Sequence, residues 1–182
     1  MVVYEKSEPG CTVKTITMAA ERAAADGVHL VVASTTGATA WKAAVEAARL
    51  KILDKLVIVG SVQDRGKSKI SDQTVKQLQE MGITVVRTSH VLSGAERGLS
   101  SKLGGVYPVE IMAHTLRMLS QGVKVCLECS VMALDCGAIP YGEAVVAVGG
   151  TGRGADTACV LTPAGANAIL ESRIHEILCK PY

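Results

Sequence analysis

The chain has no phenylalanine, and aromatic residues make up only 3% of its 182 positions. Proteins that bind single-stranded nucleic acids rely on stacking against aromatic side chains, so this scarcity argues against such a partner. Acidic and basic residues are interspersed, and the formal net charge is only +2. Without a basic stripe the chain lacks the electrostatic footprint of a nucleic-acid-binding protein. We therefore expect no nucleic-acid partner.

Long apolar runs are also missing. The runs at residues 56–59 and 144–148 are far shorter than the ~20 residues that a membrane helix needs. The first residues lack the basic and then apolar pattern of a secretory signal. We therefore expect a cytoplasmic protein that does not contact a membrane. Hydrophobic residues make up 48% of the chain, enough for one well-buried core, so we expect a single domain over residues 1–182.

The six cysteines come without a secretory signal, so we expect reduced thiols rather than disulfides. Cys126, Cys129 and Cys136 are close enough in sequence to suggest metal ligands. Cys129 and Cys136, however, share the spacing of one helical face with Val125, and cysteine is among the most often buried residues. We therefore favour packing and expect no metal. Glu128 lies on the opposite face of this helix, where we expect solvent.

Helical periodicity and apolar runs alternate along the chain. The expected helices cover residues 12–26, 39–48, 71–81, 108–121, 123–135 and 164–179. The expected strands cover residues 29–33, 55–60, 83–87, 142–148 and 157–161. This alternation indicates an α/β fold with a parallel or mixed sheet covered on both faces. In such sheets ligands bind beyond the carboxyl ends of the strands, where the strand order reverses.

A run of small and hydroxyl-bearing residues follows the strand at 29–33 and opens the next helix. It consists of Ser34, Thr35, Thr36, Gly37, Ala38, Thr39 and Ala40. The first N–H groups of a helix have no partner within it, and the aligned peptide dipoles leave partial positive charge there, which suits a phosphate. The same hydroxyls could simply cap the helix. The position beyond a strand end favours the phosphate site.

A glycine-rich run lies between the last two expected strands. It reads Gly149, Gly150, Thr151, Gly152, Arg153, Gly154, Ala155, Asp156 and Thr157. Such glycine density lets backbone N–H groups approach an anion, although a plain turn is the alternative. The spacing differs from a dinucleotide fingerprint, and a strand rather than a helix follows. Arg153 could clamp a phosphate or face water, and Asp156 could accept from a ribose or ribityl hydroxyl or pair with Arg153.

Residues 88–107 show no clear periodicity and form a longer connection than is usual in a compact domain. Long loops often carry function. This excursion contains acidic, basic and hydroxyl side chains, namely His90, Ser93, Glu96, Arg97 and Lys102. They could cover a ligand, or their charges could pair with one another in solvent. No Ser-His-Asp order and no nucleotide P-loop lysine is present, so the sequence leaves any catalytic residues unknown.

These motifs resemble the C-terminal domain of pyruvate kinase. Residues 31–40, preceded by an alanine-rich helix, are similar to the first strand and phosphate-binding loop of that domain. Residues 105–109 and the pairing of 143–149 with 157–161 are similar to it as well. The strongest signatures are Ser93-Gly94-Ala95-Glu96-Arg97, Gly122-Val123-Lys124-Val125 and residues 149–157. The resemblance spans nearly the whole chain and looks most like a stand-alone family of uncharacterised prokaryotic proteins built from this domain alone.

The resemblance implies a three-layer α/β/α sandwich with a five-stranded, mostly parallel sheet in the order 3-2-1-4-5, the last strand antiparallel. In pyruvate kinases this domain serves regulation, and in some of them the matching loop receives the phosphate of a sugar-bisphosphate effector. Ser34, Thr35, Thr36, Gly37 and Thr39 inherit that role by position. The catalytic barrel, typically ~250 residues, does not fit in these residues, so pyruvate kinase activity is not implied. The insertion at 88–107 departs from the kinase pattern and puts the kinase's own effector in doubt.

Together these features indicate a cytoplasmic protein that holds a phosphate-bearing, nucleotide-like molecule between the two loops. Flavin mononucleotide (FMN) is a candidate cofactor, with its phosphate at residues 34–39, its ribityl hydroxyls near 151–157 and its ring under the excursion. Two alternatives are an enzyme that uses residues 88–107 as a lid and a regulatory module that senses a phosphorylated metabolite. The high apolar fraction makes a homo-oligomer plausible.

Overall fold

The computed structural model describes residues 1–62, 68–152 and 154–182. In these residues it has one sheet of seven strands, in the order β1-β7-β6-β5-β2-β3-β4. The strands are β1 (Val2–Tyr4), β2 (His29–Ala33), β3 (Leu56–Ser61), β4 (Thr84–Thr88), β5 (Val145–Gly149), β6 (Thr157–Thr162) and β7 (Arg173–Pro181).

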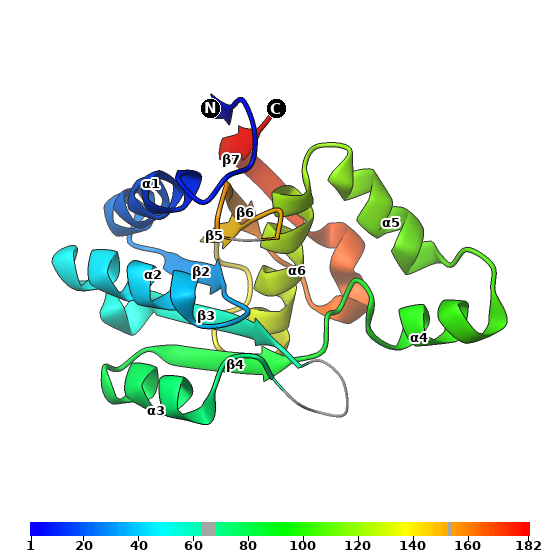
Figure 1. Cartoon of the computed structure of the whole chain (residues 1–182), viewed down its shortest axis with the longest axis horizontal. Coiled ribbons are helices and arrows are strands. Elements are labelled where there is room, and N and C mark those ends of the chain that lie inside the picture. Colours follow the sequence, from blue (N-terminus) through cyan, green and yellow to red (C-terminus); the bar gives the residue numbers. More distant parts are fainter. Residues whose placement is uncertain (63–67, 153) are drawn as a thin grey trace.

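Helices cover both faces of the sheet (Figure 1). One face carries α1 (Cys11–Asp26), α2 (Ala38–Arg49) and α3 (Asp72–Glu80), and the other carries α6 (Gln121–Asp135). α5 (Pro108–Arg117) packs against α6, and α4 (Gly94–Leu103) contacts α5. The described residues also form the short 3-10 helices η1 (Leu53–Lys55) and η3 (Ala166–Glu171), and the whole is an α/β/α sandwich. In the described ranges, no helix is long and apolar enough to cross a bilayer.

The order of the central strands matches the sequence prediction. The five expected strands appear as β4-β3-β2-β5-β6, and β6 runs antiparallel to β5. The strand order therefore reverses between β2 and β5, which pair in parallel. The loops that follow these two strands start from the same edge of the sheet, which is where a ligand site is expected in an open α/β sheet.

Two additional strands extend the sheet beyond the five that were predicted. β7 pairs antiparallel with β6, and β1 pairs in parallel with β7. The predicted helix over residues 164–179 is wrong, because this segment forms η3 and most of β7. Its apolar residues do recur at helical spacing. The free edge of β6, however, offers a row of unpaired N–H and C=O groups, and pairing with it outweighs a weak local preference.

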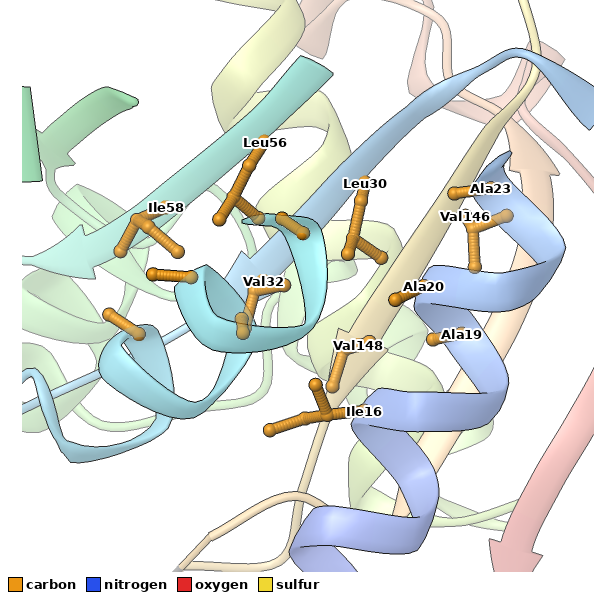
Figure 2. Packing of buried hydrophobic residues seen from close by; sticks show 14 of the residues in the cluster. Ile16, Ala19, Ala20, Ala23, Leu30, Val32, Leu56, Ile58, Val146 and Val148 are labelled. Carbon is orange, nitrogen blue, oxygen red and sulfur yellow. The ribbon is translucent and has the colours of Figure 1, made fainter. Parts of the chain in front are cut away.

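The core lies in two layers, one on each face of the sheet. Successive residues of a strand point to opposite faces, so each central strand serves both layers. Figure 2 shows Leu30 and Val32 of β2 on the face covered by α1 and α2. Val31, between them, belongs to the layer under α6. Small residues line the inner side of α1 and bring this helix close to the sheet: Ala19, Ala20 and Ala23.

The excursion at residues 88–107 is not the irregular loop that its lack of periodicity suggested. Ten of its residues form α4. The apolar stripe that reveals a helix in a sequence exists because one face is buried. None of the residues of α4 is buried, so the stripe is missing and the helix could not be recognised.

Candidate functional site

A cavity of about 770 Å³ lies beyond the carboxyl ends of β2 and β3. Its size falls within the range of small-molecule sites. The loop after β2 and the glycine-rich run after β5 both line it, as expected from their positions at the strand reversal. The lining residues from these two loops are Ser34, Thr35, Thr36, Ala38, Thr39, Gly150, Gly152 and Gly154.

The amino-terminal end of α2 presents free backbone donors to this cavity. The Ser34 hydroxyl is buried and accepts a hydrogen bond from the backbone N–H of Ala40 at 3.2 Å. No described residue accepts from the N–H groups of Ala38 and Thr39, both of which line the cavity. These N–H groups sit at the positive end of the helix dipole. Ser34 thus has the capping role, and the neighbouring donors remain free for an anion.

Glycines are required where the two loops turn. Gly37 has a φ of +96°, and a Cβ placed there would lie 2.9 Å from Cγ2 of Thr74. A Cβ on Gly150 would overlap the carbonyl oxygen of Gly154, and one on Gly149 would lie 2.5 Å from the carbonyl oxygen of Gly122. A larger residue at these positions would force the backbone apart. β5 and α6 are therefore in close contact at Gly149, whereas at Gly150 the glycine-rich loop packs against its own residue Gly154.

The charged residues that line the cavity are cationic. Lys42 on α2 and Lys69 before α3 are exposed at its rim, and His90 also lines it. No aspartate or glutamate occurs among the described lining residues. An excess of one sign of charge around a cleft concentrates ligands of the opposite sign. The arrangement favours an anionic ligand.

Asp156 and Thr157 hold the glycine-rich loop in place. Asp156 is buried, and its Oδ2 accepts hydrogen bonds from the Ser7 hydroxyl at 2.6 Å and from the backbone N–H of Thr151 at 3.0 Å. Its Oδ1 accepts from the Thr157 hydroxyl at 2.7 Å, and Thr157 is fully buried. The expected pairing of Asp156 with Arg153 lies outside the described residues. The structure gives Asp156 a clear role in shaping the loop.

The excursion residues separate into three groups. His90 lines the main cavity. Ser93 and Glu96 line a smaller cavity of about 340 Å³, to which His90 also contributes. Arg97 and Lys102 are exposed on α4 and line neither cavity. Of the five excursion residues named from the sequence, His90 is thus the one that reaches the main cavity.

Glu128 is fully buried, so the expectation that it faces solvent is wrong. Its Oε1 accepts a hydrogen bond from the backbone N–H of Leu92 at 3.1 Å. Its Oε2 lies 2.5 Å from Nζ of Lys124, which is also buried, and 2.9 Å from Nδ1 of His90. The expectation failed because the sheet covers one face of α6, while α5 and residues 90–92 cover the other.

The neighbours of Glu128 keep it ionised. Burial by itself raises the pKa of this carboxyl, but the hydrogen bond from His90 and the charge of Lys124 outweigh burial and lower the pKa below 4.5. A carboxyl whose pKa is lower in the folded than in the unfolded state stabilises the fold at pH values above its unfolded-state pKa. This stabilisation is lost as the pH falls through its folded-state pKa.

We therefore expect an acid-dependent difference between the wild type and Glu128→Gln. The wild type should be the more stable of the two near neutral pH, and its advantage should shrink as the pH falls below the ordinary titration range of a glutamate carboxyl. Urea unfolding of both proteins across this range measures the difference. A constant difference would show that Glu128 has the same pKa in the folded and unfolded states.

Two of the three clustered cysteines are packed in the interior. Cys126 and Cys129 are buried, whereas Cys136 is exposed, so the expected buried face ends before Cys136. The Cys126 thiol points to the carbonyl oxygen of Ala147 at 3.4 Å. Burial raises the pKa of the Cys126 and Cys129 thiols, which keeps both protonated. Cys129 also lines the main cavity with Val125 and Met132, three residues that sequence reasoning assigned only to packing.

The family model described as pyruvate kinase, alpha/beta domain, matches residues 14–161. The match includes β2 to β6, the glycine-rich run and the loop that opens α2. The additional strands β1 and β7 lie outside it. The match covers most of the chain and confirms the resemblance seen in the sequence. The chain therefore belongs to the pyruvate kinase alpha/beta domain family.

Proposed function

We propose that this protein is a cytoplasmic binding protein for a phosphate-bearing small molecule. The observation that carries the proposal is the cavity of about 770 Å³ lined by both loops, where the N–H groups of Ala38 and Thr39 have no acceptor among the described residues. The phosphate would accept hydrogen bonds from these groups and from the Thr35, Thr36 and Thr39 hydroxyls. Lys42 and Lys69 at the rim would draw the anion in.

FMN remains our candidate for the ligand. Val125, Cys129 and Met132 give the cavity an apolar wall for a ring, and the glycine-rich run offers backbone groups for a polyol. FMN would absorb visible light and colour the purified protein yellow. Added FMN should raise the melting temperature, because a ligand that binds only the folded state stabilises it. A colourless protein whose melting temperature does not respond to FMN would eliminate this ligand while leaving other phosphate compounds open.

Thr36→Asp tests the phosphate position directly. A carboxylate near the start of α2 should stabilise the helix by about 0.3–1 kcal/mol. The same negative charge should repel a phosphate and raise the Kd at least about fivefold, because like charges a few ångströms apart cost about 1–4 kcal/mol. Stability and affinity should thus change in opposite directions, as measured by thermal unfolding and by calorimetric titration with FMN and with inorganic phosphate.

Thr36→Asn is the matched control, because it has nearly the same size as aspartate and no charge. It replaces the Thr36 hydroxyl by an amide that can also donate to the phosphate, so it should leave the stability close to that of the wild type and raise the Kd far less than aspartate does. Equal weakening by Asn and Asp would show that the hydroxyl rather than the local charge matters. Unchanged binding in the Asp variant would place the phosphate elsewhere.

A regulatory module is the second candidate, and the surface of α4 and α5 favours it. Leu99 and Leu103 on α4 are exposed, as are Val106, Ile111 on α5 and Met118. Figure 1 shows these two helices away from α1 and α2, at the other side of the molecule. Exposed apolar patches often mark protein contacts, and a second copy of the chain would make a homo-oligomer. Size-exclusion chromatography with and without bound ligand tests whether binding changes the assembly.

A further inference from the structure

His90, Lys124 and Glu128 form a buried cluster that the phosphate site does not explain. The side chains of Lys124 and Glu128 are 5% and 0% exposed, whereas that of His90 is 39% exposed. A buried ion pair seldom contributes more stability than apolar residues of the same volume. The partly exposed imidazole is the member of the cluster that reaches the cavity.

The cluster sets which nitrogen of His90 carries the proton. The carboxylate of Glu128 is held in its ionised form by Lys124 and by the Leu92 N–H, so it can only accept hydrogen bonds. Nδ1 of His90, 2.9 Å from Oε2, must therefore donate. In the neutral ring the other nitrogen, Nε2, is then left with a lone pair. No described residue donates to it.

The strand order sets the approximate spacing between the two chain segments that carry the phosphate position and His90. β3 separates β2 from β4 in the sheet, so the carboxyl ends of β2 and β4 are about 10 Å apart. Ser34 follows β2 directly, and His90 follows β4 by two residues. Both line the same cavity. A ligand whose phosphate binds at the start of α2 would thus need one or two rings between that phosphate and the group that reaches His90.

We propose that His90 is a second binding subsite of this cavity, which accepts a hydrogen bond from a hydroxyl or N–H group about 10 Å from the ligand's phosphate. The inference rests on the proposed function and narrows its ligand class. Nucleoside monophosphates and related compounds carry such donors on their rings. A sugar bisphosphate would instead present acceptor oxygens to Nε2, and these would require a second proton on the ring.

The tautomer of His90 can be measured without any ligand. Long-range ¹H–¹⁵N correlation spectra at about pH 8, above the usual titration range of imidazole, distinguish the two neutral forms. We expect a protonated Nδ1 for His90, with His90→Asn identifying its signals. A protonated Nε2 would overturn the proposal, whether or not phosphate compounds bind.

Two variants of His90 separate ligand contact from structural support. In His90→Asn the amide nitrogen replaces Nδ1 and keeps the contact with Glu128, but the acceptor at Nε2 is lost. In His90→Gln the amide oxygen can take the place of Nε2. Calorimetric titrations would use adenosine monophosphate, which has a ring amino group, and inorganic phosphate, which reaches only the end of α2.

We expect His90→Asn to raise the Kd for adenosine monophosphate about 3- to 10-fold, the effect of one lost hydrogen bond, and His90→Gln to raise it less. Inorganic phosphate should bind all three proteins within about twofold. Equal weakening of both probes would overturn the proposal, because it would make His90 a structural support. The proposal would also be overturned if the wild type bound adenosine monophosphate no more tightly than inorganic phosphate. Failure of the wild type to bind either probe would instead refute the proposed function on which the subsite rests.

Discussion

Replacing Lys124 by methionine is expected to lower the free energy of unfolding by about 3–5 kcal/mol. The substitution removes the cation 2.5 Å from Oε2 of Glu128 and leaves this fully buried carboxylate with the hydrogen bonds from His90 and the Leu92 N–H but without its lysine partner. Methionine fills a similar volume, so the loss reports on charge rather than on a cavity. Chemical denaturation at neutral pH measures it.

Two controls accompany this prediction. Lys76→Met breaks an equivalent i,i+4 pair with Glu80 on α3, where both side chains are more than 60% exposed, and should change the stability by no more than about 0.5 kcal/mol. The double variant Lys124→Met with Glu128→Gln removes the unpaired charge and retains an acceptor for the Leu92 N–H. It should recover a large part of the loss. If Lys124→Met lowers the free energy of unfolding no more than Lys76→Met does, Lys124 does not stabilise the carboxylate of Glu128.

Gly122→Ala is expected to cost about 3 kcal/mol or more. A Cβ at this position in α6 would overlap the Thr157 side chain and lie 2.9 Å from Oδ1 of Asp156. Both residues are buried and hydrogen-bonded, so neither can move without releasing the glycine-rich loop. We therefore expect the variant to lose ligand affinity as well as stability, measured by urea unfolding and by titration with FMN.

Gly98→Ala is the matched control for this substitution. Gly98 lies in α4, and a Cβ there meets no atom within 4 Å. Alanine should raise the stability by about 0.5–1 kcal/mol, because it reduces the entropy lost when the helix forms. A similar effect of the two substitutions would mean that α6 and the corner at residues 156–157 are not in close contact.

The sequence predicted that residues 34–40 open a helix after a strand, which the structure confirms, and left open which hydroxyl caps that helix. The order of strand, hydroxyl-rich run and helix was sufficient to place residues 34–40 at the amino-terminal end of a helix beside the sheet. Which hydroxyl caps the helix depends on distances that sequence spacing does not contain. The structure assigns that role to Ser34, and no acceptor for the N–H groups of Ala38 and Thr39 occurs in the part of the chain that it describes.

Glu128 and the carboxyl-terminal segment show where reasoning from one segment reaches its limit. A position opposite the apolar stripe of a helix predicts solvent, but the chain at residues 90–92 covers that face of α6 and supplies two partners for the carboxylate of Glu128. In the same way, residues 173–181 form a strand because β6 has a free edge. Each outcome depends on a neighbour distant in sequence, so no local pattern could reveal it.

The sequence by itself determined the layered α/β architecture, the order of the five central strands and the two loops that share the cavity. It could do so because buried parallel strands and helix starts leave local signals, and because the resemblance supplied the strand order. Only the tertiary structure decided that Asp156 braces the glycine-rich loop and that Glu128 contacts His90, a residue that lines the cavity. Those roles depend on which groups come into contact when the layers pack. A buried charge needs a partner, and that partner can come from a segment distant in sequence.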